Sequence, residues 1–185
     1  FIPLVHEACY VMERQKIQQT ELDSAVKFRL GFPMGIFELA DFTGLDVIHK
    51  ATVEMHTRDK KVILPHPTIE QLFNEKKLGQ KSGEGFYKYS DDKYERIPLS
   101  EELAQKCDPV QIIANILNNA AWLVTNNASD IDEIEKAANL GLGLKKPLFD
   151  TAKEIGMQKI VEELKKLSNK HGTFYEPDPL LLSMC

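Results

Sequence analysis

The stretch LGFPMGIFELADFTGLD, residues 30–46, decides the fold of this chain. After an early proline and glycine, its apolar and acidic residues recur at helical spacing, which predicts a short helix over residues 36–43. Gly44 follows that helix directly, where helices commonly end on a residue of positive φ. Asp46 is expected to cap a further helix over residues 47–58. The stretch therefore predicts two helices joined at a glycine.

The same pattern returns later in the chain as LGLKKPLFDTAKEIGMQ, residues 142–158. A shift of 112 residues, as from Gly44 to Gly156, aligns the two halves of the sequence without a gap. The identical pairs fall mainly on glycines, prolines, aromatics and alanines: Ala8/Ala120, Leu30/Leu142, Gly31/Gly143, Phe37/Phe149, Pro65/Pro177 and Pro67/Pro179. The two halves are therefore expected to share one fold. Because no convincing β-sheet pattern is present, the sequence predicts an all-α protein, a tandem duplicated helical bundle.

Local signals predict where helices of the second half begin. Asp108 and Pro109 form a good N-cap followed by a proline at the first helical position. Asp130, with Glu133 three residues later, is similar to a capping box. Residues 158–168 are apolar on one side, as expected of the counterpart of the helix predicted over residues 47–58.

A polar stretch, KYSDDKYERIPL at residues 88–99, separates the two halves. We expect a first domain at residues 1–90, a linker at 91–107 and a second, diverged and truncated copy at 108–185. The chain lacks an initiator methionine and opens inside an apolar helical pattern. It is therefore expected to be a piece of a longer polypeptide.

Composition excludes several classes of protein. The chain has 185 residues with 43% hydrophobic and 28% charged residues, as in ordinary globular domains. A formal charge of −5 offers no basic face for nucleic acid or an anionic membrane. No apolar run approaches the roughly 20 residues of a membrane span. Cys9, Cys107 and Cys185 are odd in number and far apart, which argues against disulfides and zinc and favours a reducing, cytoplasmic location.

The stretch KLGQKSGEGFYKY, residues 77–89, invites comparison with a phosphate-binding loop. That motif needs a glycine directly before its lysine, and Gln80 stands before Lys81. No amphipathic helix follows to direct its amide groups at an anion. The sequence favours instead a glycine-rich turn that lets Phe86 and Tyr87 fold back onto a core.

Residues 30–46, followed by residues 77–89, resemble two signature segments of the C-terminal helical domain of NAD-dependent 3-hydroxyacyl-CoA dehydrogenases. Ile36 stands where that family usually has proline. The resemblance implies a fold similar to the C-terminal domain of 6-phosphogluconate dehydrogenase, with no Rossmann domain in this chain. The second copy departs from the signature, since Lys145, Lys146 and Pro147 replace Pro33, Met34 and Gly35, and Lys153 replaces Asp41.

The resemblance also implies a function. Enzymes of this family oxidise 3-hydroxyacyl-CoA to 3-oxoacyl-CoA in fatty-acid β-oxidation, with NAD and a catalytic His–Glu pair held by an N-terminal Rossmann domain. This chain would then hold no catalytic, cofactor-binding or metal-binding residue, and it would be inactive alone. Its substrate-binding candidates are Pro33, Met34 and Gly35, in a loop that would line the acyl pocket.

Two copies in tandem resemble the arrangement in multifunctional members of the family, which are often fused to an enoyl-CoA hydratase domain. The expected partners are therefore acyl-CoA, the chain's own Rossmann domain and such a hydratase domain. The two copies are expected to pair as an internal pseudo-dimer, which would leave the fragment a monomer. A non-catalytic helical interaction module and a 3-hydroxybutyryl-CoA dehydrogenase fragment remain as alternatives.

Other residues invite catalytic interpretations. The histidines show no metal-ligand spacing and are expected to be surface or capping residues: His6, His49, His56, His66 and His171. Glu38 and Asp41, three apart, could form a pair for acid–base chemistry. We expect a structural role instead, near the helix start, where anionic groups meet the positive end of the helix dipole.

Overall fold

The computed structural model describes residues 1–58, 64–90 and 98–185. Within those ranges every regular element is a helix, and the only β-type pairings are two isolated bridges, which link Gly79 with Glu84 and Glu84 with Lys88. The all-α class predicted from the sequence is confirmed. In the same ranges, no helix has both the length and the apolar character needed to cross a membrane.

The chain divides into two compact units. Unit 1 comprises residues 1–28 and 34–107, and unit 2 comprises residues 29–33 and 108–185. Part of the predicted linker, residues 91–97, lies outside the described residues. The described remainder of the linker belongs to unit 1 and contains a short helix.

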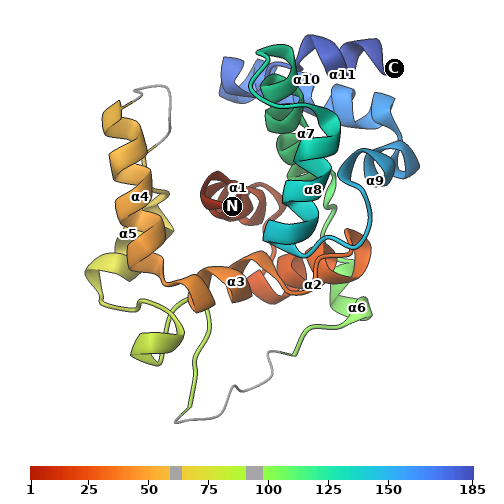
Figure 1. Ribbon diagram of the computed structural model, residues 1–185. Helices are drawn as coiled ribbons and strands as arrows, with labels where there is room; N and C mark the ends of the chain where they lie inside the picture. Colours follow the sequence, from red (N-terminus) through yellow and green to blue (C-terminus); the bar gives the residue numbers. More distant parts are fainter. Residues whose placement is uncertain (59–63, 91–97) are drawn as a thin grey trace. The chain divides into compact units, whose positions relative to one another are not determined.

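Unit 1 is built on helix α1, which packs against α3 and α4, while α4 also packs against α5. Figure 1 shows α3 leading directly into α4, with α5 alongside. Its helices are α1 (Ile2–Gln15), α2 (Gln19–Arg29), α3 (Ile36–Thr43), α4 (Leu45–Arg58), α5 (Pro67–Asn74), a 3₁₀ turn (Gln80–Ser82) and α6 (Glu101–Ala104). The core includes Val5, Leu22, Phe37, Ile48 and Ile69, all fully buried.

Unit 2 is built in the same way around α7, which packs against α8, α9, α10 and α11. Its helices are α7 (Val110–Thr125), α8 (Ile131–Leu142), α9 (Leu148–Ile155), α10 (Met157–His171), a 3₁₀ turn (Thr173–Tyr175) and α11 (Pro179–Ser183). The core includes Ile112, Leu117, Phe149, Ile160 and Leu164.

The predicted duplication is confirmed by the helix boundaries. Helices α8, α9, α10 and α11 each begin 112 residues after α2, α3, α4 and α5. Phe37 and Phe149, which the repeat pairs, are both buried, with 0% and 4% of their surface exposed. The same sequence pattern has therefore produced the same helix order twice.

Helix ends follow the local signals in part. Gly44 and Gly156 have the predicted positive φ, at 98° and 103°. Asp130 caps α8, since its carboxylate accepts the amide of Glu133 at 2.8 Å. The prediction for Asp46 is wrong, because α4 begins one residue before it, at Leu45.

The predicted cap of α7 is displaced by one residue. Pro109, and not Asp108, is the N-cap, and Val110 is the first helical residue. Asp108 still accepts the amide of Val110 at 3.1 Å. The side chain therefore satisfies a helix-start donor from one position further out than predicted.

All three cysteines lie in described residues and none forms a disulfide. Cys9 and Cys107 are buried, and Cys185 is exposed. Burial raises the pKa of the Cys9 thiol, so that it remains a neutral, unreactive group. The cytoplasmic location inferred from the cysteine pattern stays a prediction.

Candidate functional site

The three substrate-binding candidates form the loop that leads into α3. Pro33 is exposed, Met34 is half-buried and Gly35 is buried. Gly35 is the N-cap of α3, and its amide donates to the Glu38 carboxylate at 3.0 Å. The structural role predicted for Glu38 at the helix start is therefore confirmed.

Asp23, on α2, fixes the start of α3. Its carboxylate accepts the amide of Phe37 at 2.9 Å and the amide of Glu38 at 3.0 Å. A Cβ atom at position 35 would lie 2.1 Å from Asp23 Cγ, so only glycine fits there. Sequence reasoning missed this role of Asp23; the available signal was its pairing with Glu135 under the repeat.

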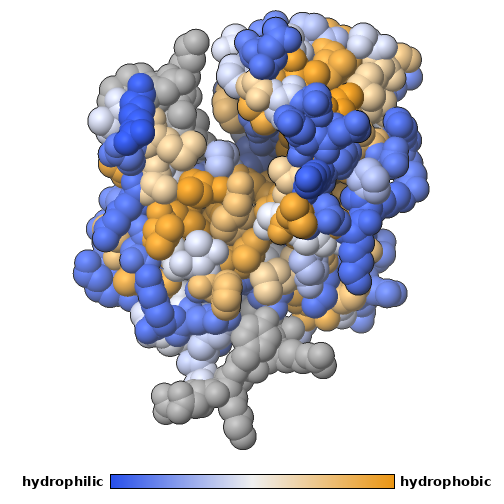
Figure 2. Space-filling model, viewed as in Figure 1, coloured by the Kyte–Doolittle hydropathy of each residue, from blue (hydrophilic) through white to orange (hydrophobic). Residues whose placement is uncertain are grey.

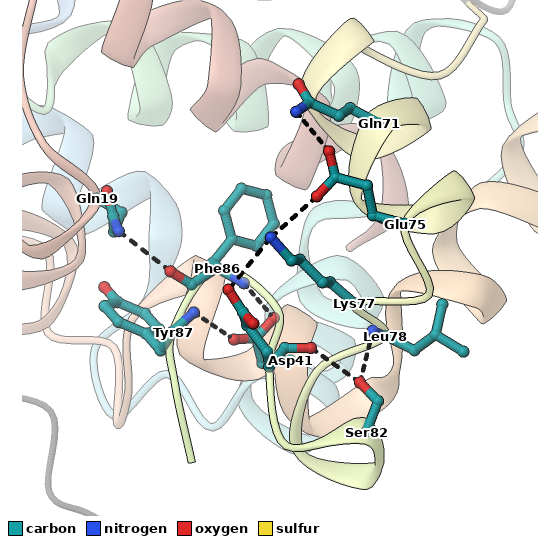
Figure 3. Close-up of polar contacts among 10 residues, drawn as sticks. Gln19, Asp41, Gln71, Glu75, Lys77, Leu78, Ser82, Phe86 and Tyr87 are labelled. Carbon is teal, nitrogen blue, oxygen red and sulfur yellow. Dashed lines mark hydrogen bonds and ion pairs between the residues drawn. The ribbon is translucent and has the colours of Figure 1, made fainter.

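Asp41, at the far end of α3, holds the glycine-rich turn. Its two carboxylate oxygens accept the amides of Phe86 and Tyr87, each at 2.9 Å, and the hydroxyl of Tyr89 donates to it at 2.9 Å. Figure 3 shows Asp41 beneath the two amides, with the turn folded around it. Asp41 therefore has a structural role, but the predicted location at the helix start is wrong.

The fold-back of the turn is confirmed. The Phe86 ring packs on Phe37, with ring centroids 4.2 Å apart. The hydroxyl of Tyr87 donates to Asp23 at 2.9 Å. Asp23 and Asp41, with the backbone amides and tyrosines that donate to them, form what we call the carboxylate clasp. The clasp joins α2, α3 and the turn.

Burial governs the electrostatics of the clasp. Burial raises the pKa of Asp23 to about 7, although hydrogen bonds from Phe37, Tyr87 and Glu38 act in the opposite direction. Burial likewise raises the pKa of Asp41, against the same kind of opposing hydrogen bonds. Burial and the nearby carboxylates raise the pKa of Tyr87, so its phenol stays a proton donor.

The turn is a poor cradle for a phosphate, because most of its amides are already committed. Internal acceptors take the amides of Leu78, Gly79, Ser82, Gly83, Gly85, Phe86 and Tyr87. A Cβ at Gly79 would lie 2.2 Å from the Asp41 carbonyl oxygen, and one at Gly85 would lie 2.1 Å from Asp41 Oδ1. These glycines allow the backbone of the turn to lie close to α3, and they do not serve the binding of a ligand.

The residues present therefore do not fit a nicotinamide dinucleotide. Such a cofactor needs a strand, a glycine-rich turn and a helix whose N-terminus faces the pyrophosphate. The described parts of the chain contain no strand, and the glycine-rich turn leads to Tyr89 and Ser90 outside any helix. In those parts, no group of three His, Cys, Asp or Glu residues could hold a metal ion.

The structure agrees with the predicted location of the histidines except at His6. His66 is the N-cap of α5, as expected of a capping histidine. His6 is 1% exposed and lies inside unit 1, so the expectation of a surface or capping residue is wrong for it. His49 contacts Glu70 at 2.6 Å and stacks on the Phe73 ring at 4.0 Å.

Unit 2 keeps one half of the clasp. Glu135, on α8, accepts the amides of Leu148 and Phe149 at 2.6 and 2.8 Å, as Asp23 does at the start of α3. At the position equivalent to Asp41, Lys153 pairs instead with Asp150 at 3.1 Å. The carboxylate that would hold a glycine turn is therefore absent from unit 2.

Comparison with known proteins places the first half of the chain in a family. The model of the 3-hydroxyacyl-CoA dehydrogenase C-terminal domain matches residues 1–89. Residues 1–89 belong to that family. The two signature stretches of this domain are the ones that the carboxylate clasp joins.

Relatives of the domain support the same assignment. Hydroxyacyl-coenzyme A dehydrogenase, mitochondrial, of Rattus norvegicus is 40% identical over 90 residues, which are 48% of this chain and 29% of that protein. A probable 3-hydroxybutyryl-CoA dehydrogenase of Deinococcus radiodurans is 34% identical over 90 residues, covering 48% of this chain and 32% of that protein. The matched domain spans about a third of the length of these relatives.

Solved structures extend the likeness beyond the matched domain. A 3-hydroxybutyryl-CoA dehydrogenase from Escherichia coli K12 matches with a TM-score of 0.77 and 19% identity, over 99% of this chain and 58% of that one. The dehydrogenase part of multifunctional enzyme 1 from C. elegans matches with a TM-score of 0.62 and 18% identity, over 96% and 46%. At these identities the likeness shows the fold, and it includes the second half.

Proposed function

We propose that this chain is the C-terminal, substrate-side part of an NAD-dependent (S)-3-hydroxyacyl-CoA dehydrogenase. The complete enzyme would oxidise 3-hydroxyacyl-CoA to 3-oxoacyl-CoA in fatty-acid β-oxidation. The observation that carries this proposal is the family membership of residues 1–89, whose two signature stretches meet at Asp41. The names of the relatives, all dehydrogenases of coenzyme A thioesters, agree with it.

The cofactor would be bound elsewhere. The committed amides of the glycine-rich turn leave no cradle for a pyrophosphate, so NAD binding and proton abstraction fall to a Rossmann domain outside this sequence. When bound there, NAD would accept the hydride. The role of this chain is to bind and orient the acyl group, which lowers the entropic cost of bringing the reacting carbon to the nicotinamide.

The loop at Pro33, Met34 and Gly35 is our candidate for contact with the acyl chain. Pro33 is exposed and Met34 half-buried, so both can offer apolar surface to a ligand. Methionine suits such a position because its unbranched side chain adapts to different shapes. Gly35 would shape the loop, since Asp23 occupies the space where a side chain would lie.

The equivalent surfaces of the two copies differ in polarity. On unit 1, Figure 2 shows an apolar area over α3 and the adjoining end of α4. Phe42 on α3 and Val47 on α4 are 67% and 47% exposed, and the repeat pairs them with Glu154 and Lys159. Exposed apolar surface of this kind marks contact sites. We assign the apolar face of unit 1 to contacts within the complete enzyme, and the charged counterpart to solvent.

The tandem organisation suggests a multifunctional enzyme with an internal pseudo-dimer of the two copies. One solved structure with the same fold is the dehydrogenase part of a multifunctional enzyme, which agrees with a tandem organisation. Sedimentation equilibrium of the 185-residue chain should then report a 21.0 kDa monomer. A tight dimer would mean that the copies pair between chains.

The test is a comparison of the full-length gene product with this chain. The full-length protein should reduce acetoacetyl-CoA with NADH, whereas the chain alone should show neither turnover nor NAD binding. A series of 3-oxoacyl-CoA substrates of increasing length distinguishes a 3-hydroxybutyryl-CoA dehydrogenase, which would act only on the shortest. A full-length protein with no turnover of any member would instead support a non-catalytic helical module.

A further inference from the structure

His6 is held in one protonation state by its hydrogen bonds. Its Nδ1 accepts the backbone amide of His66 at 3.2 Å, so Nδ1 carries no proton. Its Nε2 lies 2.7 Å from the Thr52 hydroxyl, which itself donates to the Ile48 carbonyl at 2.8 Å. The Thr52 oxygen must therefore accept, and the single proton of His6 is on Nε2. His6 is thus neutral and joins α1, α4 and the start of α5.

His66 is held in the same state. Its Nδ1 accepts the amide of Thr68 at 3.2 Å and so caps α5. Its Nε2 lies 3.3 Å from Glu13 Oε1, although without hydrogen-bond geometry. Its ring and the Tyr10 ring form a T-shaped pair, with centroids 4.5 Å apart. Both buried histidines therefore use Nδ1 to accept an amide at the start of α5, from its N-cap residue or from Thr68.

We call the hydrogen bonds of His6 and His66 at the start of α5 the joint of unit 1. Unit 2 forms the equivalent joint at the start of α11 with different residues. Asn118, equivalent to His6, accepts the amide of Asp178 at 2.8 Å. Asp178, equivalent to His66, accepts the amide of Leu180 at 2.9 Å and so caps α11. Thr125, equivalent to Glu13, donates to Asp178 at 2.6 Å. The amide acceptors are at matching positions in the two units, but only unit 1 uses imidazoles.

An added proton has a direct geometric consequence. The second proton of an imidazolium is on Nδ1, where it would face the amide hydrogen of His66 or of Thr68. Two donors cannot bond to each other, so protonation of either ring breaks its hydrogen bond to the amide. Asn118 has no such protonation step, and its carbonyl oxygen remains an acceptor.

The surroundings oppose protonation of these rings. Burial, with His66 and His49 nearby, lowers the pKa of His6 to about 4. Burial also lowers the pKa of His66, while the Glu13 carboxylate acts in the opposite direction. Other titratable or charged groups near these rings include Tyr10, Arg14 and Glu7 on α1, and Glu70, which contacts His49, on α5.

We propose that His6 and His66 form a proton-sensitive latch, which holds the start of α5 at neutral pH and releases it in mild acid. The equivalent joint of unit 2, Asn118 and Asp178, does not respond in that range. Because α5 leads into the glycine-rich turn, the latch makes this end of unit 1 the acid-sensitive part of the chain.

Amide hydrogen exchange of the 185-residue chain at pH 7 and pH 5 tests the latch, with rates corrected for intrinsic exchange. Opened histidines bind protons near pH 6.5 and the latched His6 near pH 4, so acid favours opening. The protection of the Thr68 amide should fall roughly tenfold between the two pH values. The equivalent amide of Leu180 in unit 2 should change by less than about twofold.

Variants taken from unit 2 provide the control. His6→Asn should reduce the response at Thr68, because only His66 is then left to bind a proton, and the double variant His6→Asn/His66→Asp should remove it. Ionisation of other groups, such as Asp23, is common to all three proteins and cancels in the comparison. Equal responses at Thr68 and Leu180, or a full response in the double variant, would overturn the proposal. If the single variant does not fold, the double variant decides.

Discussion

Four helices of unit 2 begin at a constant offset of 112 residues from their counterparts in unit 1, but different polar residues bind their ends. In unit 1, Asp23 holds the start of α3 and Asp41 holds the glycine-rich turn. In unit 2, Glu135 does the first task, whereas Lys153 stands in place of Asp41. A helix start always leaves amide donors that need an acceptor, so that position remains acidic. The position that serves only the turn has changed its charge.

The largest expected effect concerns the shared core. Phe37→Ala and Phe149→Ala should each lower the free energy of unfolding by about 3–5 kcal/mol, because each removes a buried ring. The loss at Phe37 should be the greater, since it also removes the contact with Phe86. Urea unfolding followed by circular dichroism measures both. Losses below about 1 kcal/mol at both positions would contradict equivalent core roles.

Removing the carboxylate that holds the glycine-rich turn should destabilise unit 1, whereas the equivalent change in unit 2 should have little effect. Asp41→Ala leaves the amides of Phe86 and Tyr87 without their acceptor, which should cost about 3 kcal/mol. Lys153→Ala should change stability by less than about 0.5 kcal/mol, because Lys153 is 62% exposed. Fluorescence of Trp122, the single tryptophan, reports the unfolding of unit 2 and should not change in Asp41→Ala. Similar losses in the two variants would remove the distinction between the units.

The raised pKa of Asp23 predicts a pH dependence of stability. Since the folded state binds this proton more tightly than the unfolded state, the contribution is complete below pH 3.8 and is lost as pH rises to about 7. Between pH 5 and 7 the loss should be roughly 1 kcal/mol per pH unit. Asp23→Asn cannot ionise, so the difference from wild type should change with pH by that amount. A constant difference across this range would be evidence against a protonated Asp23.

The paired helix ends should show a smaller effect than the core and the turn. Gly44→Ala should cost about 1–2 kcal/mol, because alanine is strained at a φ of 98°. A Cβ at Gly44 would also lie 2.8 Å from Lys81 Nζ, whereas one at Gly156 would meet its nearest atom at 3.9 Å. Gly156→Ala should therefore cost about 1 kcal/mol, from backbone strain alone. Thermal melting of the two variants measures the difference, and a greater loss at Gly156 would contradict this order.

Much of the fold was determined by the sequence through local signals. The helix over residues 36–43, the N-cap at Asp130 and the positive φ of Gly44 depend on neighbours a few residues apart, so short patterns predict them. The duplication was also predictable, since an ungapped offset preserves glycines and core aromatics. The two signature stretches were sufficient to predict the family of the first half.

Only the tertiary structure decided what the buried polar groups do. Asp41 meets amides 45 and 46 residues away, and His6 meets an amide 60 residues away. No local pattern specifies such partners, because they depend on which helices pack together. Burial then sets the chemistry, since a carboxylate or imidazole removed from water must find a donor or acceptor, or change its charge. For that reason the sequence alone predicted several helices of both units, whereas the acceptors that join those helices were found only in the folded chain.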